Sequence, residues 1–365
     1  MTKFQVKQDG NHVELHGARE TIFYEVQGTT LPPLTDFSFA VWHLLAAAMT
    51  QGFDIEIDGP VDSAVIDNAR RFSRIWELWA PEKFREVRVT GHEIEPTTDS
   101  TRPDLTLFSG GIDSTHMLLK LGKREPASTV LTIQGMDYRT DVNAQFLALL
   151  KMTDPLLETL NYDRITLKTN VAIISRGTHS WALTLAGCSF LLSGLFGRAS
   201  FAADTTWEED FMIFPWGSNH VTNRLLRGTA FSVTALGEEF RRVEKVADIA
   251  LNEVALNSIS FCKNRAMRPR NCGKCDKCLR NKLLFAAATG RVPRIFIDNS
   301  FDRSGIYSVD WTTFDQSIFF VSAYQQARAN GTIDKIPGLE QRFNELFRAK
   351  KPNSILGRII RRIRK

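Results

Sequence analysis

The spacing of apolar and polar residues divides the chain near residue 100. Before that point, short stretches alternate apolar with polar side chains, which is the period of a half-buried strand. These predicted strands cover residues 4–6, 12–15, 21–26, 53–58 and 84–90. Two stretches, residues 37–49 and 61–78, have the period of a helix instead, and a polar linker with two prolines follows at residues 92–103. We therefore expect residues 1–100 to form a separate α+β module.

From residue 101 the pattern becomes strand followed by helix, repeated several times. Strands are predicted at residues 105–108, 128–134, 164–169 and 199–204. Helices are predicted at residues 112–120, at 142–160, broken or capped around Asp154 and Pro155, and at 181–195. This alternation is typical of a parallel sheet with helices on both faces, so we predict an α/β domain over residues 101–285.

Two further regions complete the predicted domain organisation. Residues 286–350 form a C-terminal α+β extension, with a strand at residues 294–298 and a helix at residues 317–328. Residues 351–365 form a basic amphipathic tail. Such a tail suits an anionic membrane surface, RNA phosphates or a protein partner, and a terminal helix packed on its own domain is the alternative.

The first strand of the α/β domain leads into a turn with two adjacent glycines. Its residues are Ser109, Gly110, Gly111, Ile112, Asp113, Ser114 and Thr115. Two glycines let the backbone turn sharply and approach a ligand closely, because neither carries a Cβ. The free N–H groups and the positive dipole end of the following helix favour a phosphate there. The hydroxyl groups add donors, and the Asp113 carboxylate is a candidate ligand for Mg²⁺. No lysine follows the second glycine, which excludes the GxxxxGK[ST] loop.

Other candidate site residues lie after later strands, at the same edge of the sheet. Gln134 and Gly135 end the second strand, where open α/β sheets bind their ligands. Arg176 and His179 lie in the loop before the third predicted helix of this domain, and we predict that they meet pyrophosphate or substrate. Solvated loop side chains are an equally good interpretation of these two residues.

The chain then departs from the regular alternation. Asp204 ends a strand, and residues 205–222 follow with no clear period and contain Trp207 and Trp216. Irregular segments of this length are usually functional or mobile, so we expect substrate recognition here, with simple apolar packing as the alternative. The amphipathic pattern of residues 240–251 predicts a helix that serves packing.

Four cysteines are clustered within seventeen positions. They are Cys262, Cys272, Cys275 and Cys278, and the last three form two CxxC steps that share Cys275. Four thiolates at this spacing suit tetrahedral Zn²⁺, and a filled coordination shell leaves no place for catalytic water, so we predict a structural zinc. An iron–sulfur cluster uses similar ligands and stays open as an alternative, whereas a redox dithiol would leave two cysteines without a purpose. The fifth cysteine, Cys188, is predicted to lie in the core.

Together the two motifs resemble known enzymes. Ser-Gly-Gly-Ile-Asp-Ser is similar to the SGGxDS signature of the PP-loop ATP pyrophosphatases, and Cys-Gly-Lys-Cys-Asp-Lys-Cys-Leu-Arg resembles the 7-cyano-7-deazaguanine synthase family within them. The resemblance covers roughly residues 104–285 and implies an adenine nucleotide alpha hydrolase-like fold. It implies an ATP site at residues 109–115, a backbone that receives adenine near Gln134, and a structural zinc on the four cysteines.

The resemblance also implies a reaction. An ATP-dependent ligase of this type activates a carboxylate as an acyl-adenylate with release of pyrophosphate, and ammonia or an amine then attacks to give an amide or nitrile, as in queuosine biosynthesis. The chain departs from the family in the 100 residues before its PP-loop, in the residues after the cysteines, and in residues 176–223, which do not resemble a deazapurine pocket. We therefore expect a different carboxylate, on a sugar, a peptide terminus or a modified base.

Two other functions stay open. One is a PP-loop enzyme that transfers sulfur to tRNA, for which only Cys188 would be the reactive cysteine and the basic tail an RNA grip. The other is a catalytically silent nucleotide-binding subunit of an assembly, which the intact glycine motif argues against.

Composition narrows the setting of the protein. Of 365 residues, 43% are hydrophobic and 24% are charged, which is typical of a globular protein and argues against disorder. No apolar run reaches the roughly 20 residues of a membrane span, and the N-terminus lacks a signal-peptide core. We therefore expect a cytoplasmic location, and the sequence leaves the oligomeric state open, a homodimer included.

Overall fold

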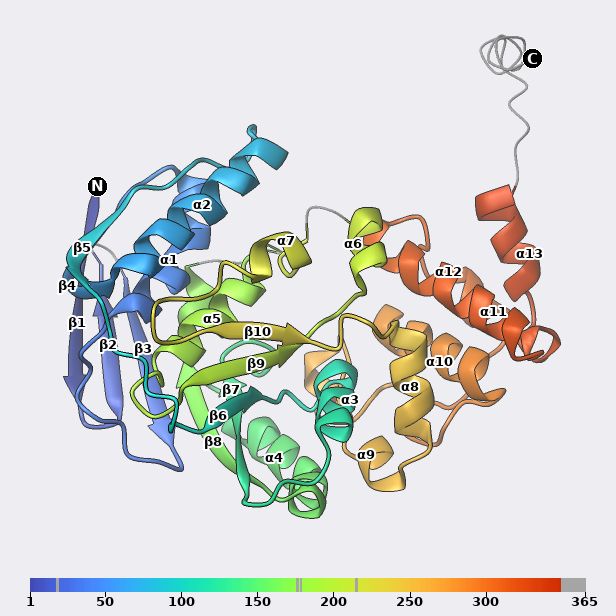
Figure 1. Cartoon of the computed structure of the whole chain (residues 1–365). Coiled ribbons are helices and arrows are strands. Elements are labelled where there is room, and N and C mark those ends of the chain that lie inside the picture. The colour runs from blue at the N-terminus through green and yellow to red at the C-terminus, as the bar shows by residue number, and fades with distance from the viewer. Residues whose placement is uncertain (18–19, 175–176, 178, 214–215, 349–365) are drawn as a thin grey trace, which may run out of the picture.

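The computed structural model describes residues 1–17, 20–174, 177, 179–213 and 216–348. Within these residues, ten strands form a single sheet with helices on both faces (Figure 1). The strand order is β10-β9-β6-β7-β8-β3-β2-β1-β4-β5. This arrangement confirms the predicted α/β class. In the described part of the chain, no helix has the length and apolar character needed to cross a membrane.

Five parallel strands form the half of the sheet that leads into the glycine turn. They are β6 (Asp104–Leu107), β7 (Ser128–Gln134), β8 (Tyr162–Thr169), β9 (Arg198–Ala202) and β10 (Val233–Leu236). All neighbouring pairs among them are parallel. β6 comes first in the chain but lies between β7 and β9, so the chain winds outward from β6 in both directions. The strand order therefore reverses between β6 and β9, and open α/β sheets bind ligands beyond the carboxyl ends of the strands at such a point.

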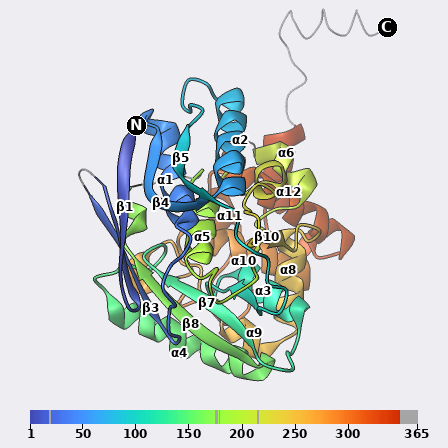
Figure 2. The ribbon, with the colours of Figure 1, turned by 60° about the vertical axis from the view of Figure 1, so that its left-hand side comes forward.

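The N-terminal strands extend this sheet. They are β1 (Thr2–Asp9), β2 (His12–His16), β3 (Thr21–Gln27), β4 (Ile55–Asp62) and β5 (Val89–Ile94). β3 pairs antiparallel with β8, with Tyr24 opposite Thr169, so the first 100 residues join the α/β domain edge to edge (Figure 2). One apolar core also runs through both parts, from Phe4 to Ala235. The boundary predicted at residue 100 therefore does not divide the hydrophobic core.

Helices cover both faces of the sheet and bury two separate cores. One face carries α1 (Ser38–Gln51), α2 (Ser63–Trp79) and α5 (Trp181–Phe190). The other carries α3 (Ile112–Leu121), α4 (Asn143–Leu160), α8 (Arg242–Ala250), α9 (Glu253–Asn257) and α10 (Asp276–Thr289). Asp62 caps α2 by accepting a hydrogen bond from the Ala64 N–H. The predicted break in α4 is wrong, since the helix continues through Pro155.

The C-terminal extension is helical in its described residues. Its helices are α11 (Arg303–Tyr307), α12 (Phe314–Ala329) and α13 (Leu339–Phe343), and α12 packs on α10 (Figure 1). The strand predicted at residues 294–298 is wrong, because Phe296 forms only an isolated bridge with Asn271. Its ring instead packs beside the cysteines, 5.8 Å from the ring of Phe261. The basic tail at residues 351–365 lies outside the described residues.

Candidate functional site

The glycine turn connects β6 to α3 at the point where the strand order reverses. Gly110 has φ +71°, and a Cβ there would lie 3.0 Å from Leu149 Cδ1, so both the backbone angle and the packing favour glycine. Gly111 precedes α3 as its N-cap and has no side-chain cap. The N–H groups of the first helical turn have no acceptor within the helix and carry its positive dipole. Ser109 Oγ lies 3.1 Å from Ser114 Oγ, so the hydroxyl groups line the same turn.

Asp113, the acidic residue of the turn, is held by two cations from α8. Arg242 Nη2 lies 2.7 Å from Asp113 Oδ2, and Lys245 Nζ lies 3.3 Å from Asp113 Oδ1. The Lys245 side chain is 1% exposed, and its ammonium group also donates to the carbonyl oxygen of Ala203 at the end of β9. The turn, α8 and the edge of β9 therefore meet at one carboxylate.

Sequence reasoning assigned α8 to packing and missed these two residues. Arg242 and Lys245 are three positions apart, which places them on one side of the helix. That side adjoins the buried positions Val243 and Val246. The sequence does contain a signal for these two residues, because both cations lie next to apolar core positions, whereas solvated cations usually lie on the opposite face of a helix.

A third cation, Arg280 from α10, lies beside Arg242. The two guanidinium carbons are 4.3 Å (Arg280) and 5.0 Å (Arg242) from the centre of the Phe319 ring of α12. Burial, together with the positive charge of Arg242, lowers the pKa of Arg280 to about 10. The structure thus brings Arg280 of α10 together with Arg242 of α8 and Phe319 of α12.

A second carboxylate, Asp204, follows β9 on the same edge of the sheet. Burial raises its pKa, and the negative charge of Asp113 raises it further. Trp216 Nε1 donates to Asp204 Oδ2 at 3.0 Å. The irregular segment predicted for substrate recognition thus places Trp216 at this carboxylate.

The rest of that segment forms two short helices, α6 (Trp207–Ile213) and α7 (His220–Asn223). Asp210 joins them, because its carboxylate accepts from Thr205 Oγ1 and lies 2.9 Å from His220 Nδ1. Trp207 is 57% exposed and donates to Glu238 instead. The two tryptophans therefore have different surroundings, and of the two only Trp216 donates to Asp204.

The residues predicted at the end of β7 form a tight turn. Gln134 Nε2 donates to the carbonyl oxygen of Arg139 at 2.8 Å and to Asn143 Oδ1 at 3.0 Å. Gly135 has φ +124°, and a Cβ there would lie 1.7 Å from the carbonyl oxygen of Thr169. The structure thus explains why glycine stands at this position. Adenine binding by this turn stays a prediction.

His179 packs against aromatic side chains that come from α2 and from the segment that follows α2. Its ring centre is 5.0 Å from that of Phe84 and 6.2 Å from that of Trp76. Neither ring nitrogen has a hydrogen-bond partner among the described residues, and burial lowers the pKa of His179 to about 4. These contacts join His179 to the N-terminal strands and helices and not to Asp113. Arg176, the other predicted loop residue, lies outside the described residues.

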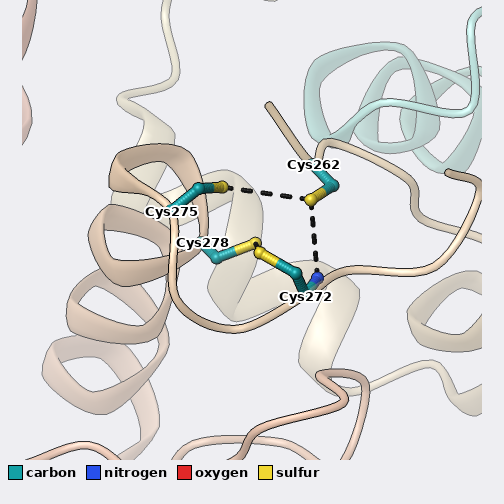
Figure 3. Close-up of side chains that lie close together, drawn as sticks. All are labelled: Cys262, Cys272, Cys275 and Cys278. Carbon is teal, nitrogen blue, oxygen red and sulfur yellow. Dashed lines mark hydrogen bonds between the residues drawn. The ribbon is translucent and has the colours of Figure 1, made fainter. Parts of the chain in front are cut away.

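The four clustered cysteines point their sulfur atoms toward one another (Figure 3). All four Sγ atoms lie within 4.8 Å of one another, with Cys262 to Cys275 at 3.9 Å and Cys272 to Cys278 at 3.8 Å. A Zn–S bond of about 2.3 Å gives sulfur atoms about 3.8 Å apart at the corners of a tetrahedron. The cluster can therefore hold a metal ion such as zinc.

Other residues fix the backbone around the cysteines. Gly273 has φ +84°, and a Cβ there would lie 2.0 Å from the carbonyl oxygen of Asp298, so the turn requires glycine. Buried Lys282 donates to the carbonyl oxygens of Gly273 and Ser300, each at 2.7 Å.

The cysteine segment also contacts the glycine turn directly. The N–H of Ser260 donates to the carbonyl oxygen of Gly110 at 2.7 Å. Arg268, beside the short helix η2 (Arg265–Met267), donates to the carbonyl oxygens of Cys262 and Asp137, both at 2.6 Å. The loop that carries the cysteines is therefore bonded to the turns that follow β6 and β7.

Comparison with protein-family models, with curated proteins and with solved structures found no match to this chain. The resemblance to the PP-loop enzymes therefore rests on the residues of the two motifs.

Proposed function

We propose that this chain is an ATP-dependent adenylating ligase, which activates a carboxylate as an acyl-adenylate, releases pyrophosphate and passes the acyl group to ammonia or an amine. One observation carries the proposal. The Ser109–Ser114 turn opens a helix at the reversal of strand order, and Arg242 and Lys245 stand at its carboxylate.

The hydrogen-bond donors at this edge of the sheet would suit the phosphates of a nucleoside triphosphate. The turn supplies backbone N–H groups and hydroxyl groups, which bind phosphate oxygens at a helix N-terminus. Lys245 and Arg242 would add positive charge where pyrophosphate develops its negative charge, and preorganised charge of this kind stabilises a transition state. ATP supplies the activating group for the carboxylate.

Mg²⁺ has two candidate ligands here. Asp113 and Asp204 are close enough for the charge of Asp113 to raise the pKa of Asp204, and oxygen donors suit this cation. A bound Mg²⁺ would bridge phosphate oxygens and offset their charge. Asp113 would then share its oxygens between the cation and the side chains of α8.

The proposed metal at the cysteines is a structural zinc. Four sulfur ligands complete a tetrahedral shell, so the metal would hold the loop in place and would bind no substrate. An iron–sulfur cluster is the alternative, and metal analysis separates the two because only the cluster contains iron and sulfide.

The sulfur-transfer alternative is less well supported by the geometry. Cys188 is fully buried in α5, and burial raises the pKa of its thiol, so the reactive thiolate is disfavoured. The other cysteines of the described chain are those of the metal cluster. The glycine turn, by contrast, contains the intact Ser-Gly-Gly-Ile-Asp-Ser string that carries the resemblance to adenylating enzymes.

The test is pyrophosphate release from ATP over a panel of carboxylates with ammonium as nitrogen donor. We expect release by the wild-type protein and a loss of at least 100-fold, or about 2.7 kcal/mol, in the Asp113→Asn variant with an unchanged circular dichroism spectrum. Asp163→Asn, an exposed carboxylate on β8, is the matched control and should keep full activity. No ATP binding by calorimetry and no pyrophosphate release with any acceptor would refute the proposal.

A further inference from the structure

Arg242 and Arg280 bring two positive charges into a buried site with few anions in contact. The two residues are 8% and 7% exposed. Arg242 is paired with Asp113, whereas the described residues place no carboxylate within 4.0 Å of the Arg280 guanidinium. The described partner of Arg280 is the amide of Gln316, with Nη1 to Oε1 at 3.4 Å. Burial and the charge of Arg242 lower the pKa of Arg280, whereas the negative charges of Asp315, Asp113 and Asp204, which lie farther away, raise it. A buried cation without a direct ion pair is unfavourable, so a bound anion would stabilise this arrangement.

The donors of both groups are also incompletely used. The Nε atoms of Arg242 and Arg280 are buried, and neither has a hydrogen-bond partner among the described residues. Buried donors in proteins are nearly always paired with protein, water or ligand. Two such donors on neighbouring guanidinium groups are an independent sign of a ligand.

The ring of Phe319 lies against both guanidinium groups. Both guanidinium carbons lie over its ring, at 4.3 Å and 5.0 Å. Stacking on an aromatic ring uses the flat face of a guanidinium and leaves its N–H edge for two oxygens of a carboxylate or phosphate. Phe319 itself packs against Ile318 and Trp216. The C-terminal extension thus contributes a wall to this site.

The site adjoins the glycine turn and shares Arg242 with it. Arg242 contacts Asp113, whose side chain keeps 17% exposure and connects the pair to solvent at the turn. Arg280 comes from α10 and has no described hydrogen bond to the turn. A ligand anion held by Arg280 would therefore lie beside whatever occupies the turn.

We propose that Arg242 and Arg280, stacked on Phe319, form an oxyanion site that binds a carboxylate or phosphate group next to the glycine turn. The inference rests on the proposed function only for the source of the anion, which is either the acceptor carboxylate or a phosphate of ATP. Arg280 is then the specificity residue that connects the acceptor or nucleotide to the C-terminal extension.

Binding of inorganic phosphate and of α,β-methylene-ATP to the full-length metal-loaded protein tests this site by calorimetry. Arg280→Met should weaken phosphate binding at least tenfold. Arg280→Lys should weaken phosphate binding less, because lysine keeps the positive charge but cannot donate two parallel hydrogen bonds as a guanidinium does. The matched control is Arg294→Met, which removes an exposed arginine and should change binding less than twofold. Thermal melts of each variant check that the fold is retained.

The two probes distinguish the source of the anion. If Arg280→Met lowers the affinity for α,β-methylene-ATP by the same factor as the affinity for phosphate, the site binds the nucleotide. If α,β-methylene-ATP binding is kept while phosphate binding is lost, the site belongs to the acceptor. Phosphate binding that is absent in the wild type, or unchanged in a folded Arg280→Met variant, overturns the oxyanion site. Wild-type protein that binds phosphate but not α,β-methylene-ATP would refute the proposed function and leave the oxyanion site standing.

Discussion

Asp113 should be coupled energetically to both cations of α8, and more strongly to Arg242 than to Lys245. The Arg242 contact is 2.7 Å long and the Lys245 contact is 3.3 Å long, and both cations are buried. Hydrogen bonds to charged groups contribute about 1.5–3 kcal/mol. We therefore expect a coupling energy of about 2–3 kcal/mol with Arg242 and about 1 kcal/mol with Lys245.

A double-mutant cycle measures each coupling energy. The variants are Asp113→Asn, which keeps the shape of the side chain, with Arg242→Met or Lys245→Met, and the two double variants. Lys245→Met also removes the hydrogen bond to the Ala203 carbonyl oxygen, but this cost occurs in both arms of the cycle and cancels. The free energy of unfolding is measured by urea denaturation, followed by circular dichroism and by tryptophan fluorescence, and coincident curves justify a two-state fit.

The control is Asp163→Asn, an exposed carboxylate with no described ion pair, which should change stability by less than about 0.5 kcal/mol. Coupling energies below about 0.5 kcal/mol for both pairs would refute the conclusion that α8 fixes the carboxylate of the turn. A larger coupling with Lys245 than with Arg242 would refute the ranking drawn from the two distances.

Three further predictions follow from other parts of the chain. His179→Phe should stabilise the protein increasingly as pH falls from 6.5 to 4, by up to about 3 kcal/mol, because the folded state keeps the wild-type ring neutral while the unfolded state takes up a proton. Thermal melts across this pH range measure the change in stability. Loss of pyrophosphate release in a folded His179→Phe variant would instead indicate that His179 has a catalytic role. Metal analysis of the wild type should find one zinc per chain, and Cys272→Ser should lower both the zinc content and the affinity for α,β-methylene-ATP; iron with sulfide would overturn the zinc assignment. Gly135→Ala should destabilise the fold by more than about 3 kcal/mol in urea denaturation, because its Cβ would lie 1.7 Å from the carbonyl oxygen of Thr169. The control is Gly237→Ala, where φ is +82° and the space is open, and it should cost only about 1 kcal/mol. Equal losses of stability in the two variants would refute the steric argument.

The features that sequence could predict are those encoded within a short stretch. The glycine turn needs its own residues and the helix that follows, and the structure places a strand, a turn and a helix there as expected. The cysteine cluster likewise needs four residues within seventeen positions, and their sulfur atoms do converge. Local spacing determines both features, so no knowledge of the tertiary fold was required.

The features that sequence missed depend on contacts between distant segments. Lys245 reaches Asp113 across 132 positions, and nothing in the pattern of α8 shows which carboxylate it will meet. His179 looked like a site residue because its loop follows a strand at the ligand-binding edge. Its neighbours Trp76 and Phe84 come from the N-terminal segment, and their packing decides its environment.

The join between the first 100 residues and the α/β domain was missed for the same reason. β3 reads as a half-buried strand from its sequence, and this pattern is satisfied equally by a small separate sheet and by the edge of a larger one. The antiparallel pairing of Tyr24 with Thr169 determines the outcome. The helical C-terminal extension was mispredicted at Phe296, where an apolar run packs beside the cysteines and not in a sheet.

If the cysteines hold a metal and the glycine turn binds a nucleotide as proposed, the contacts between the two would make metal binding and ligand binding interdependent. Ser260, which lies two residues before Cys262, donates its N–H to the carbonyl oxygen of Gly110. Arg268 donates both to the carbonyl oxygen of Cys262 and to that of Asp137, which follows β7. A metal that orders this loop would therefore also order both turns at the carboxyl edge of the sheet. Linkage requires the reverse effect to have the same size, so a nucleotide that binds the ordered turns must raise the affinity for the metal by the same factor. A metal that contacts no substrate can in this way be required for substrate binding.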